Sequence, residues 1–170
     1  MKGKVMRAVT ATAAVLSAGI VVAAVALCIV FPNKYADKLN AAADEFGLDR
    51  ALVRSVVWAE SKFDPSAKSD KGASGLMQLM PETFAACATA LNIDGAENKI
   101  FDPETSLRCG CYYLSLMLDK FDGDVNAALM AYNAGEQNAR KFLAGEAVFP
   151  ETRKYLSDIK LAKRVYGLFR

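Results

Sequence analysis

The sequence predicts a mainly helical protein, because apolar residues recur at helical spacing and helix-start residues separate the apolar segments. Asp49, Asp102 and Asp124 each stand directly before such a segment, where a carboxylate can accept hydrogen bonds from the first turn. No alternation of apolar and polar residues, the pattern typical of half-buried strands, continues for more than a few residues. We therefore expect one helical domain after residue 31.

The helices of this domain can be placed in order along the chain. A first helix is expected from Tyr35 to Phe46, and Gly47 ends it. Residues 64–76 contain proline, two glycines and several Ser and Asp residues, which indicates an extended loop. Further helices are expected over 50–61, from Pro81 to about residue 91, from Asp102 to about 122, from Asp124 to about 134, over 137–143 and over 151–169.

The first 31 residues have the pattern of a membrane segment. Lys2, Lys4 and Arg7 precede an uncharged run over residues 8–31. As a helix this run would be roughly 36 Å long, enough for a bilayer core of ~30 Å. The basic residues favour an inside amino terminus, which places the rest of the chain on the extracytoplasmic face.

Whether the segment is cleaved is a separate question. Ala24-Val25-Ala26 has the form of a signal-peptidase site, so a secreted product is an alternative. The apolar run exceeds the ~7–15 residues of a signal-peptide core, and we therefore expect a retained anchor. The predicted organisation is a cytoplasmic segment 1–7, a single transmembrane or signal-anchor segment 8–31 and an exported domain 32–170.

Composition excludes several kinds of chemistry. The chain has 170 residues, a net charge of +2 and no run of Lys and Arg, so we expect no nucleic-acid partner. It contains no histidine, which excludes Ser-His-Asp and Cys-His catalysis and any histidine-ligated metal. Carboxylates, tyrosines, amides and backbone groups must therefore carry any reaction.

Two further patterns have structural explanations that we prefer. Cys87 could pair with Cys109 or Cys111 in an oxidising exterior, but burial of all three as small apolar residues is the favoured interpretation. Residues 122–126 resemble the start of a calcium loop, yet its twelfth position is Asn133 instead of glutamate. We expect no metal ion.

Glu60 is the candidate for chemistry. It stands at the carboxyl end of a strongly apolar predicted helix, where the helix dipole disfavours an ionised carboxylate. Burial against Trp58 and residues 77–80 would raise its pKa further. A glutamate that is protonated near neutral pH can act as a general acid, whereas a surface glutamate beside Lys62 is the ordinary alternative.

Several short motifs follow one another along the exported part of the chain. They are Glu60-Ser61, Gly72–Pro81, Phe101–Thr105, Tyr112–Leu114, Ala131–Gly135 and Pro150–Tyr155. In this order they resemble the soluble lytic transglycosylase family, over roughly residues 35 to 166. The resemblance implies a goose-type-lysozyme-like catalytic domain preceded here by the membrane anchor.

The resemblance also implies roles for individual residues. Glu60 matches the family's single catalytic acid and base, and Tyr132 matches a tyrosine whose hydroxyl approaches that carboxyl. Ser61 and Ser74 match small polar residues beside it. The remaining expected substrate-binding residues are Met77 and Gln78 on the cleft floor, Asn133, and Glu151 as a second acid of the groove.

The implied reaction is cleavage of the β-1,4 bond between N-acetylmuramic acid and N-acetylglucosamine in peptidoglycan glycan strands. Glu60 would protonate the leaving oxygen and then deprotonate the C6 hydroxyl, giving 1,6-anhydromuramic acid without a cofactor. A hydrolytic muramidase would need a second carboxylate, for which Asp64 and Asp70 are the nearest in sequence. A catalytically inactive peptidoglycan-binding assembly protein is the third alternative, against which the joint presence of Glu60, Ser74, Gln78 and Tyr132 argues.

The chain departs from the family at one turn. Where the family often has Asn-Ala-Gly-Pro-Gly-Asn, residues 133–138 read Asn-Ala-Gly-Glu-Gln-Asn, and the segment between Phe142 and Pro150 is short. These differences bear on substrate length and on endo or exo action.

Overall fold

The computed structural model describes residues 17–146 and 149–168, and the chain divides into two units, residues 1–33 and 34–170. In the first unit, residues 17–30 are helical. Residues 8–16 of the predicted membrane segment lie outside the described residues. Within the described ranges, no helix combines the length and the hydropathy needed to cross a membrane.

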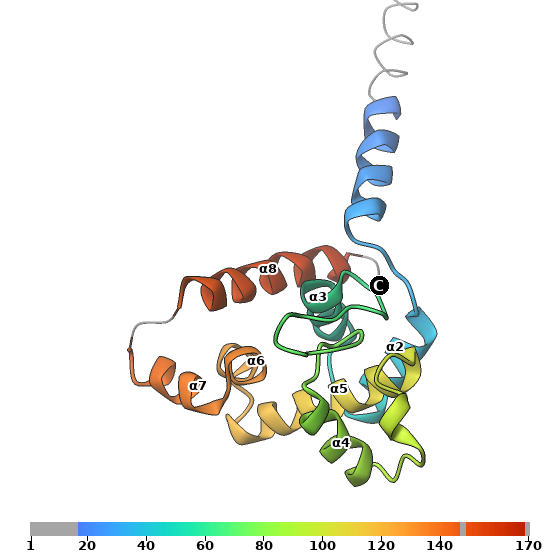
Figure 1. Cartoon of the computed structure of the whole chain (residues 1–170). Coiled ribbons are helices and arrows are strands. Elements are labelled where there is room, and N and C mark those ends of the chain that lie inside the picture. The colour runs from blue at the N-terminus through green and yellow to red at the C-terminus, as the bar shows by residue number, and fades with distance from the viewer. Residues whose placement is uncertain (1–16, 147–148, 169–170) are drawn as a thin grey trace, which may run out of the picture. The chain divides into compact units, whose positions relative to one another are not determined.

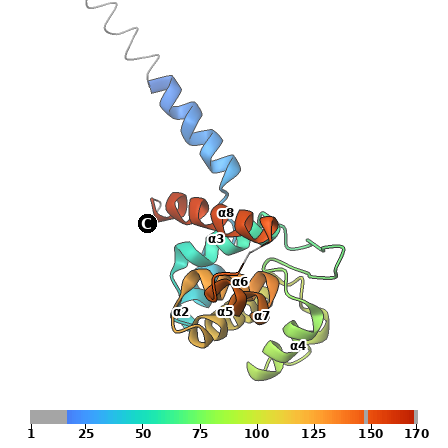
Figure 2. The same ribbon diagram turned by 90° about the vertical axis from the view of Figure 1, so that its left-hand side faces the viewer.

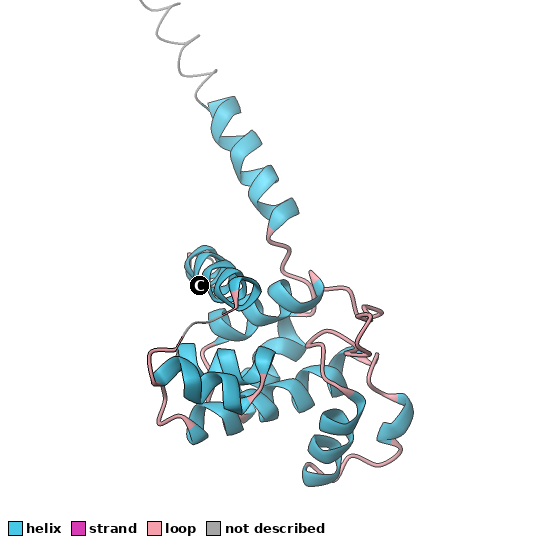
Figure 3. Ribbon diagram, turned by 60° about the vertical axis from the view of Figure 1, so that its left-hand side comes forward, coloured by secondary structure: helices cyan, strands magenta, loops and turns pink. Residues whose placement is uncertain are grey.

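The second unit is mainly helical, which confirms the predicted class of this domain (Figure 1). In the described part of this unit, backbone pairing of the strand type is limited to two isolated bridges, Lys68 with Ser74 and Ser74 with Leu79 (Figure 3). The helices are α2 (Ala36–Glu45), α3 (Arg50–Ser61), α4 (Pro81–Ala90), the short 3-10 helix η1 (Ala96–Asn98), α5 (Pro103–Lys120), α6 (Val125–Ala134), α7 (Glu136–Leu143) and α8 (Pro150–Gly167).

The predicted caps account for where three of these helices begin. The Asp49 carboxylate accepts a hydrogen bond of 2.7 Å from the Ala51 amide at the start of α3. Asp102 and Asp124 cap α5 and α6 in the same way. Such side chains satisfy amides that have no partner inside the helix. The predicted boundaries are therefore correct to within a few residues, while η1 was not predicted.

Helix α5 lies at the centre of the unit and packs against α2, α4 and α6. Two buried apolar clusters line it, one with α6 and α7 and the other with α4 and η1. Cys87 and Cys109 belong to the second cluster, and Cys111 is also buried on α5; all three are free thiols. Burial raises the pKa of Cys87 to about 11.

Helix α8 returns across the unit and packs along α3, as Figures 1 and 2 show from two directions. It also contacts α6. The carboxyl end of α3, which carries Glu60, is thereby held against a helix that lies about 95 residues further along the chain.

The loop between α3 and α4 is tied to the core at its middle. The Ser61 hydroxyl donates to the Leu76 carbonyl oxygen over 2.8 Å, and the Leu76 amide donates to the Ser106 hydroxyl over 3.1 Å. Gly75 precedes this tie with a φ of +78°, and a Cβ there would lie 2.7 Å from the Ser106 Oγ and even closer to the Ile100 carbonyl oxygen. Glycine is therefore required at this position for two reasons, backbone conformation and space.

The replacement Gly75→Ala should destabilise the fold more than Gly72→Ala. Both positions have positive φ, which costs an alanine about 1–3 kcal/mol, but a Cβ at Gly72 has no neighbour within 4 Å. Overpacking at Gly75 should add about 1–3 kcal/mol. Urea unfolding of the two full-length variants, followed by circular dichroism, measures the difference. Equal midpoints would contradict the tight approach of residue 75 to α5.

Candidate active site

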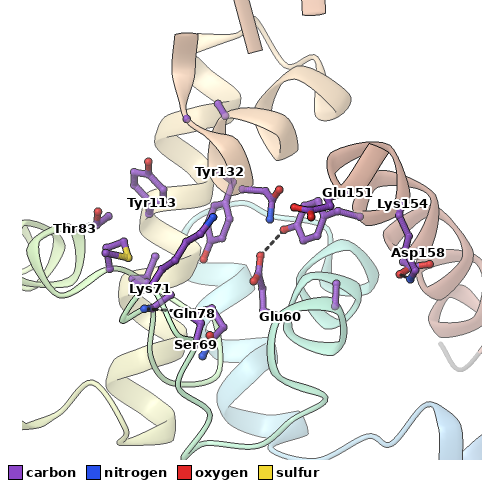
Figure 4. Close-up of a pocket in the computed structure, with 18 residues that line it drawn as sticks. Glu60, Ser69, Lys71, Gln78, Thr83, Tyr113, Tyr132, Glu151, Lys154 and Asp158 are labelled. Carbon is purple, nitrogen blue, oxygen red and sulfur yellow. Dashed lines mark hydrogen bonds and ion pairs between the residues drawn. The ribbon is translucent and has the colours of Figure 1, made fainter. Parts of the chain in front are cut away.

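A cleft of about 650 Å³ opens beside the carboxyl end of α3. One wall comes from the loop between α3 and α4, and the opposite wall comes from α8, as Figure 4 shows. Helix α6 and the residue after it close the cleft between these walls. Its lining residues are Ala59, Glu60, Ser69, Lys71, Ala73, Gln78, Leu79, Met80, Thr83, Tyr113, Ala131, Tyr132, Asn133, Gly135, Glu151, Lys154, Tyr155 and Asp158.

Glu60 projects into this cleft from the last turn of α3. Burial raises the pKa of its carboxyl to about 7, because a charged carboxylate loses solvation there. The hydrogen bond from Tyr155 and the nearby charge of Lys62 act in the opposite direction and are smaller. The direction expected from the sequence is confirmed, and the physical cause is desolvation.

Two tyrosine hydroxyls surround Glu60 and have different partners. The Tyr155 hydroxyl donates to the Glu60 Oε1 over 2.6 Å, from α8 to α3 (Figure 4). The Tyr132 hydroxyl donates to the Met77 carbonyl oxygen over 2.7 Å. The hydrogen bond to Glu60 thus comes from Tyr155, and the expected approach of the Tyr132 hydroxyl to the catalytic carboxyl stays a prediction. Burial and the nearby Glu60 charge raise both tyrosine pKa values well above the ordinary value, so both remain donors.

Lys62 completes the surroundings of the carboxyl. It follows α3 in a left-handed backbone conformation, with φ of +52°, and its Nζ lies 3.1 Å from the centre of the Trp58 ring. Attraction between an ammonium and an aromatic face holds such a side chain in place. The pKa of Lys62 lies below its ordinary value, because burial, the largest effect, lowers it, whereas the charges of Asp158 and Glu60 raise it.

The structure separates the predicted site residues into two groups. Gln78, Tyr132, Asn133 and Glu151 line the cleft together with Glu60. Gln78 adopts a φ of +48° and is fixed by hydrogen bonds of 3.0 Å from its Nε2 to the carbonyl oxygens of Ala67 and Gly75.

The other predicted residues lie behind the cleft wall. Ser61 joins α3 to the loop, and Met77 is buried. The Ser74 hydroxyl donates to the Gly72 carbonyl oxygen, and Ser74 lines a separate hollow beside α4. These three residues shape the loop that forms the wall, and substrate contact by them stays a prediction.

Sequence reasoning did not single out Tyr155 or Lys71, which lie among the residues that line the cleft. Tyr155 stood in a recognised motif but was not singled out, although it lies four residues after Glu151 and therefore on the same helix face. Lys71 stood in the loop, and no pattern in the sequence marked it.

Proteins of known function resemble this chain over most of the second unit. The soluble lytic murein transglycosylase of Escherichia coli K12 is 29% identical over 153 residues, which cover 82% of this chain and 24% of that protein. The peptidoglycan transglycosylase gp16 of phage T7 is 37% identical, over 62% of this chain and 8% of that protein. The membrane-bound lytic murein transglycosylase C of Histophilus somni strain 2336 is 34% identical, over 61% of this chain and 31% of that protein. The chain therefore spans at most about a third of these three relatives.

Solved structures of lytic transglycosylases also resemble this chain. An inactive glutamate-to-glutamine mutant of the lytic transglycosylase Slt from Pseudomonas aeruginosa superposes with a TM-score of 0.78 and 30% identity, covering 84% of this chain and 25% of that one. The 70-kDa soluble lytic transglycosylase of Escherichia coli has been solved in complex with bulgecin A, and that structure superposes with a TM-score of 0.77 and 29% identity, covering 84% of this chain and 25% of that one.

The match to a family extends from α2 to the start of α8. Residues 37–152 match the family described as Transglycosylase SLT domain. This range contains Glu60, the loop after it, Tyr132 and Glu151. The chain belongs to the Transglycosylase SLT domain family.

Proposed function

We propose that this chain is a peptidoglycan lytic transglycosylase that cleaves the β-1,4 bond between N-acetylmuramic acid and N-acetylglucosamine and forms 1,6-anhydromuramic acid. The observation that carries the proposal is that Glu60, which lines the cleft, has a pKa raised to about 7 by burial. Family membership and the lytic transglycosylases among its relatives support the reaction class.

In the first half of the reaction Glu60 acts as an acid. With a pKa of about 7, the Glu60 carboxyl retains a proton at pH values where an ordinary glutamate is ionised. Because Tyr155 donates to Oε1, the proton resides on Oε2 and is available to the glycosidic oxygen. The bond between C1 of N-acetylmuramic acid and that oxygen breaks, and the proton leaves with N-acetylglucosamine.

In the second half Glu60 acts as a base. Its carboxylate takes the proton of the C6 hydroxyl, whose oxygen forms a new bond to C1 of the same sugar. The atoms balance without water, and Glu60 returns to its protonated form. The Tyr155 hydrogen bond and the Lys62 charge both stabilise the carboxylate in the interval, since both favour its ionised form.

The placement of the other carboxylates supports the single-glutamate route. Asp64 accepts hydrogen bonds from Ser66, and neither Asp64 nor Asp70 lines the cleft. Glu151 and Asp158 do line it, and Asp158 is paired with Lys154 over 2.6 Å. Hydrolysis is the second candidate reaction. It is favoured by Glu151, whose exposed carboxylate in the cleft could activate a water molecule.

We also propose that residues 8–31 anchor the chain as a single membrane-spanning segment, with residues 1–7 in the cytoplasm and residues 32–170 as the catalytic domain outside. The uncharged run and its basic flank support this topology. A relative named as membrane-bound lytic murein transglycosylase C supports a membrane location.

The replacement Glu60→Gln should lower the rate by at least about 100-fold, because an amide can neither give nor take the proton. The assay digests purified peptidoglycan with the full chain and identifies the sugar ends by mass spectrometry. The control Glu82→Gln, an exposed residue of α4 outside the cleft, should retain activity. Anhydro ends from the unmodified chain support lytic cleavage and reducing ends support hydrolysis. Undiminished activity in Glu60→Gln would refute the role of Glu60.

The replacement Tyr155→Phe should move the pH profile of kcat/KM to higher pH. The Tyr155 hydrogen bond lowers the pKa of Glu60, so its loss raises that pKa by about one unit if the bond contributes about 1.5 kcal/mol. Activity, which requires protonated Glu60 at the start, should then decline at correspondingly higher pH. Tyr132→Phe is the matched control, because its hydroxyl bonds Met77 instead. Equal shifts in both variants would contradict the assignment.

The anchor predicts that the chain stays in the membrane fraction after high-salt washing and is released by detergent. Intact mass spectrometry of the released protein should give the mass of the full chain, 18.3 kDa. A mass that corresponds to cleavage after Ala26 would instead establish a secreted product.

A further inference from the structure

The two walls of the cleft differ in charge. The α8 wall carries the carboxylates of Glu151 and Asp158, and its only lysine on the lining, Lys154, is paired with Asp158. The wall formed by the loop between α3 and α4 carries one charged residue, Lys71. Figure 4 shows Lys71 on the side of the cleft opposite Glu151, Lys154 and Asp158.

Lys71 differs from the other cleft lysine in having no acidic partner among the described residues. Lys154 forms an ion pair within its own helix, whereas no hydrogen bond or ion pair to the Lys71 ammonium occurs in residues 17–146 and 149–168. An ammonium on a cleft wall without a protein carboxylate is available to an anion of the bound ligand.

The backbone holds Lys71 at a defined place. Lys71 is the third residue of a turn closed by the hydrogen bond from the Gly72 amide to the Ser69 carbonyl oxygen, 2.9 Å long. The Ser69 amide donates to the Ala73 carbonyl oxygen over 2.9 Å, and the Ala73 amide donates to the Ser69 hydroxyl over 3.0 Å. The base of this hairpin is closed by the hydrogen bond from the Gly75 amide to the Ala67 carbonyl oxygen, 2.9 Å long. The turn therefore holds Lys71 on the cleft wall, whereas Asp70, the residue before it in the same turn, does not line the cleft.

From this arrangement we infer that Lys71 binds a carboxylate of the substituent on the muramyl lactyl group, and so selects the orientation in which that substituent faces the loop between α3 and α4. The inference rests on the proposed function. On the opposite wall Asp158 is paired with Lys154, and the carboxylate of Glu151 repels the same group, so attraction and repulsion act together.

Two sources can supply this carboxylate. In strands that carry stem peptides, the lactyl carboxyl is in amide linkage and the free carboxylates belong to the peptide. In strands from which an amidase has removed the peptides, the lactyl group itself ends in a carboxylate. Both present the same group to Lys71, and the two kinds of strand distinguish them.

The test compares each kind of strand with a neutral counterpart, prepared by acetylating amino groups and converting carboxylates to methylamides with carbodiimide and methylamine. The quantity measured is the ratio of kcat/KM on charged and neutral strands, from release of anhydro products. For the unmodified chain this ratio should be about five on at least one kind of strand, as expected for one solvent-exposed ion pair. In Lys71→Ala it should fall to about one, and Lys71→Arg should restore it.

Lys68→Ala is the matched control. Lys68 is an exposed lysine of the same loop, but it lines the separate hollow beside α4 and not the cleft. Its ratio should equal that of the unmodified chain. The ratio is insensitive to a general loss of folded protein, because both substrates are affected equally.

The outcomes separate this inference from the proposed function. If the unmodified chain releases anhydro ends and Lys71→Ala keeps its ratio, the role of Lys71 is refuted and the reaction stands. If Lys71→Ala is inactive on neutral strands as well, the carboxylate contact is also refuted. If the unmodified chain releases no anhydro ends from any strand, the proposed function itself fails.

Discussion

The rest of the site depends on the removal of one carboxyl group, that of Glu60, from water at the end of α3. Its pKa of about 7, against 4.5 for an ordinary glutamate, corresponds to a cost of about 3 kcal/mol for holding the group ionised in the fold. Because the folded chain binds this proton more tightly than the unfolded chain, the contribution to stability is full below about pH 4.5 and is lost as the pH rises to about 7. The fold must supply the difference from packing elsewhere, chiefly where α8 lies along α3.

A series of hydrogen bonds joins the elements that enclose this carboxyl. Ser61 joins α3 to the loop at Leu76, Ser106 joins the loop to α5, and Tyr132 joins α6 to the loop at Met77. Tyr155 closes the series from α8 to Glu60. Each bond links segments far apart in sequence, so the cleft forms only when all four helices are in place. This explains why residues that do not face the cleft, such as Ser61, can still belong to the family's recognisable motifs.

Much of the fold could be predicted from local physics, whereas the site could be predicted only in part. Three helix starts could be predicted from their capping residues, Asp49, Asp102 and Asp124, because capping depends only on residues that are close in sequence. Glu60 was predictable only as a candidate acid, a carboxylate at an apolar helix end, and its role was implied by the resemblance to the family. Tyr155 was not, because its hydrogen bond to Glu60 spans 95 residues and depends on how α8 returns across α3. Lys71 was hidden for a different reason, since its place on the cleft wall depends on how the loop folds, and its neighbour in sequence, Asp70, does not line the cleft.

The raised pKa of Glu60 has a consequence for proton exchange in a chain that contains no histidine. In most enzymes imidazole groups take up or release protons near neutrality and obscure the contribution of a single catalytic carboxyl. Here that background is missing, and burial moves the pKa of the core thiols of Cys87 and Cys109 to about 11 and about 12, far above neutrality. Calorimetric titration of a glycan in buffers of different ionisation enthalpy would therefore reveal proton movement at Glu60 with little interference. The number of protons exchanged in such a titration would therefore report chiefly on the carboxyl of Glu60.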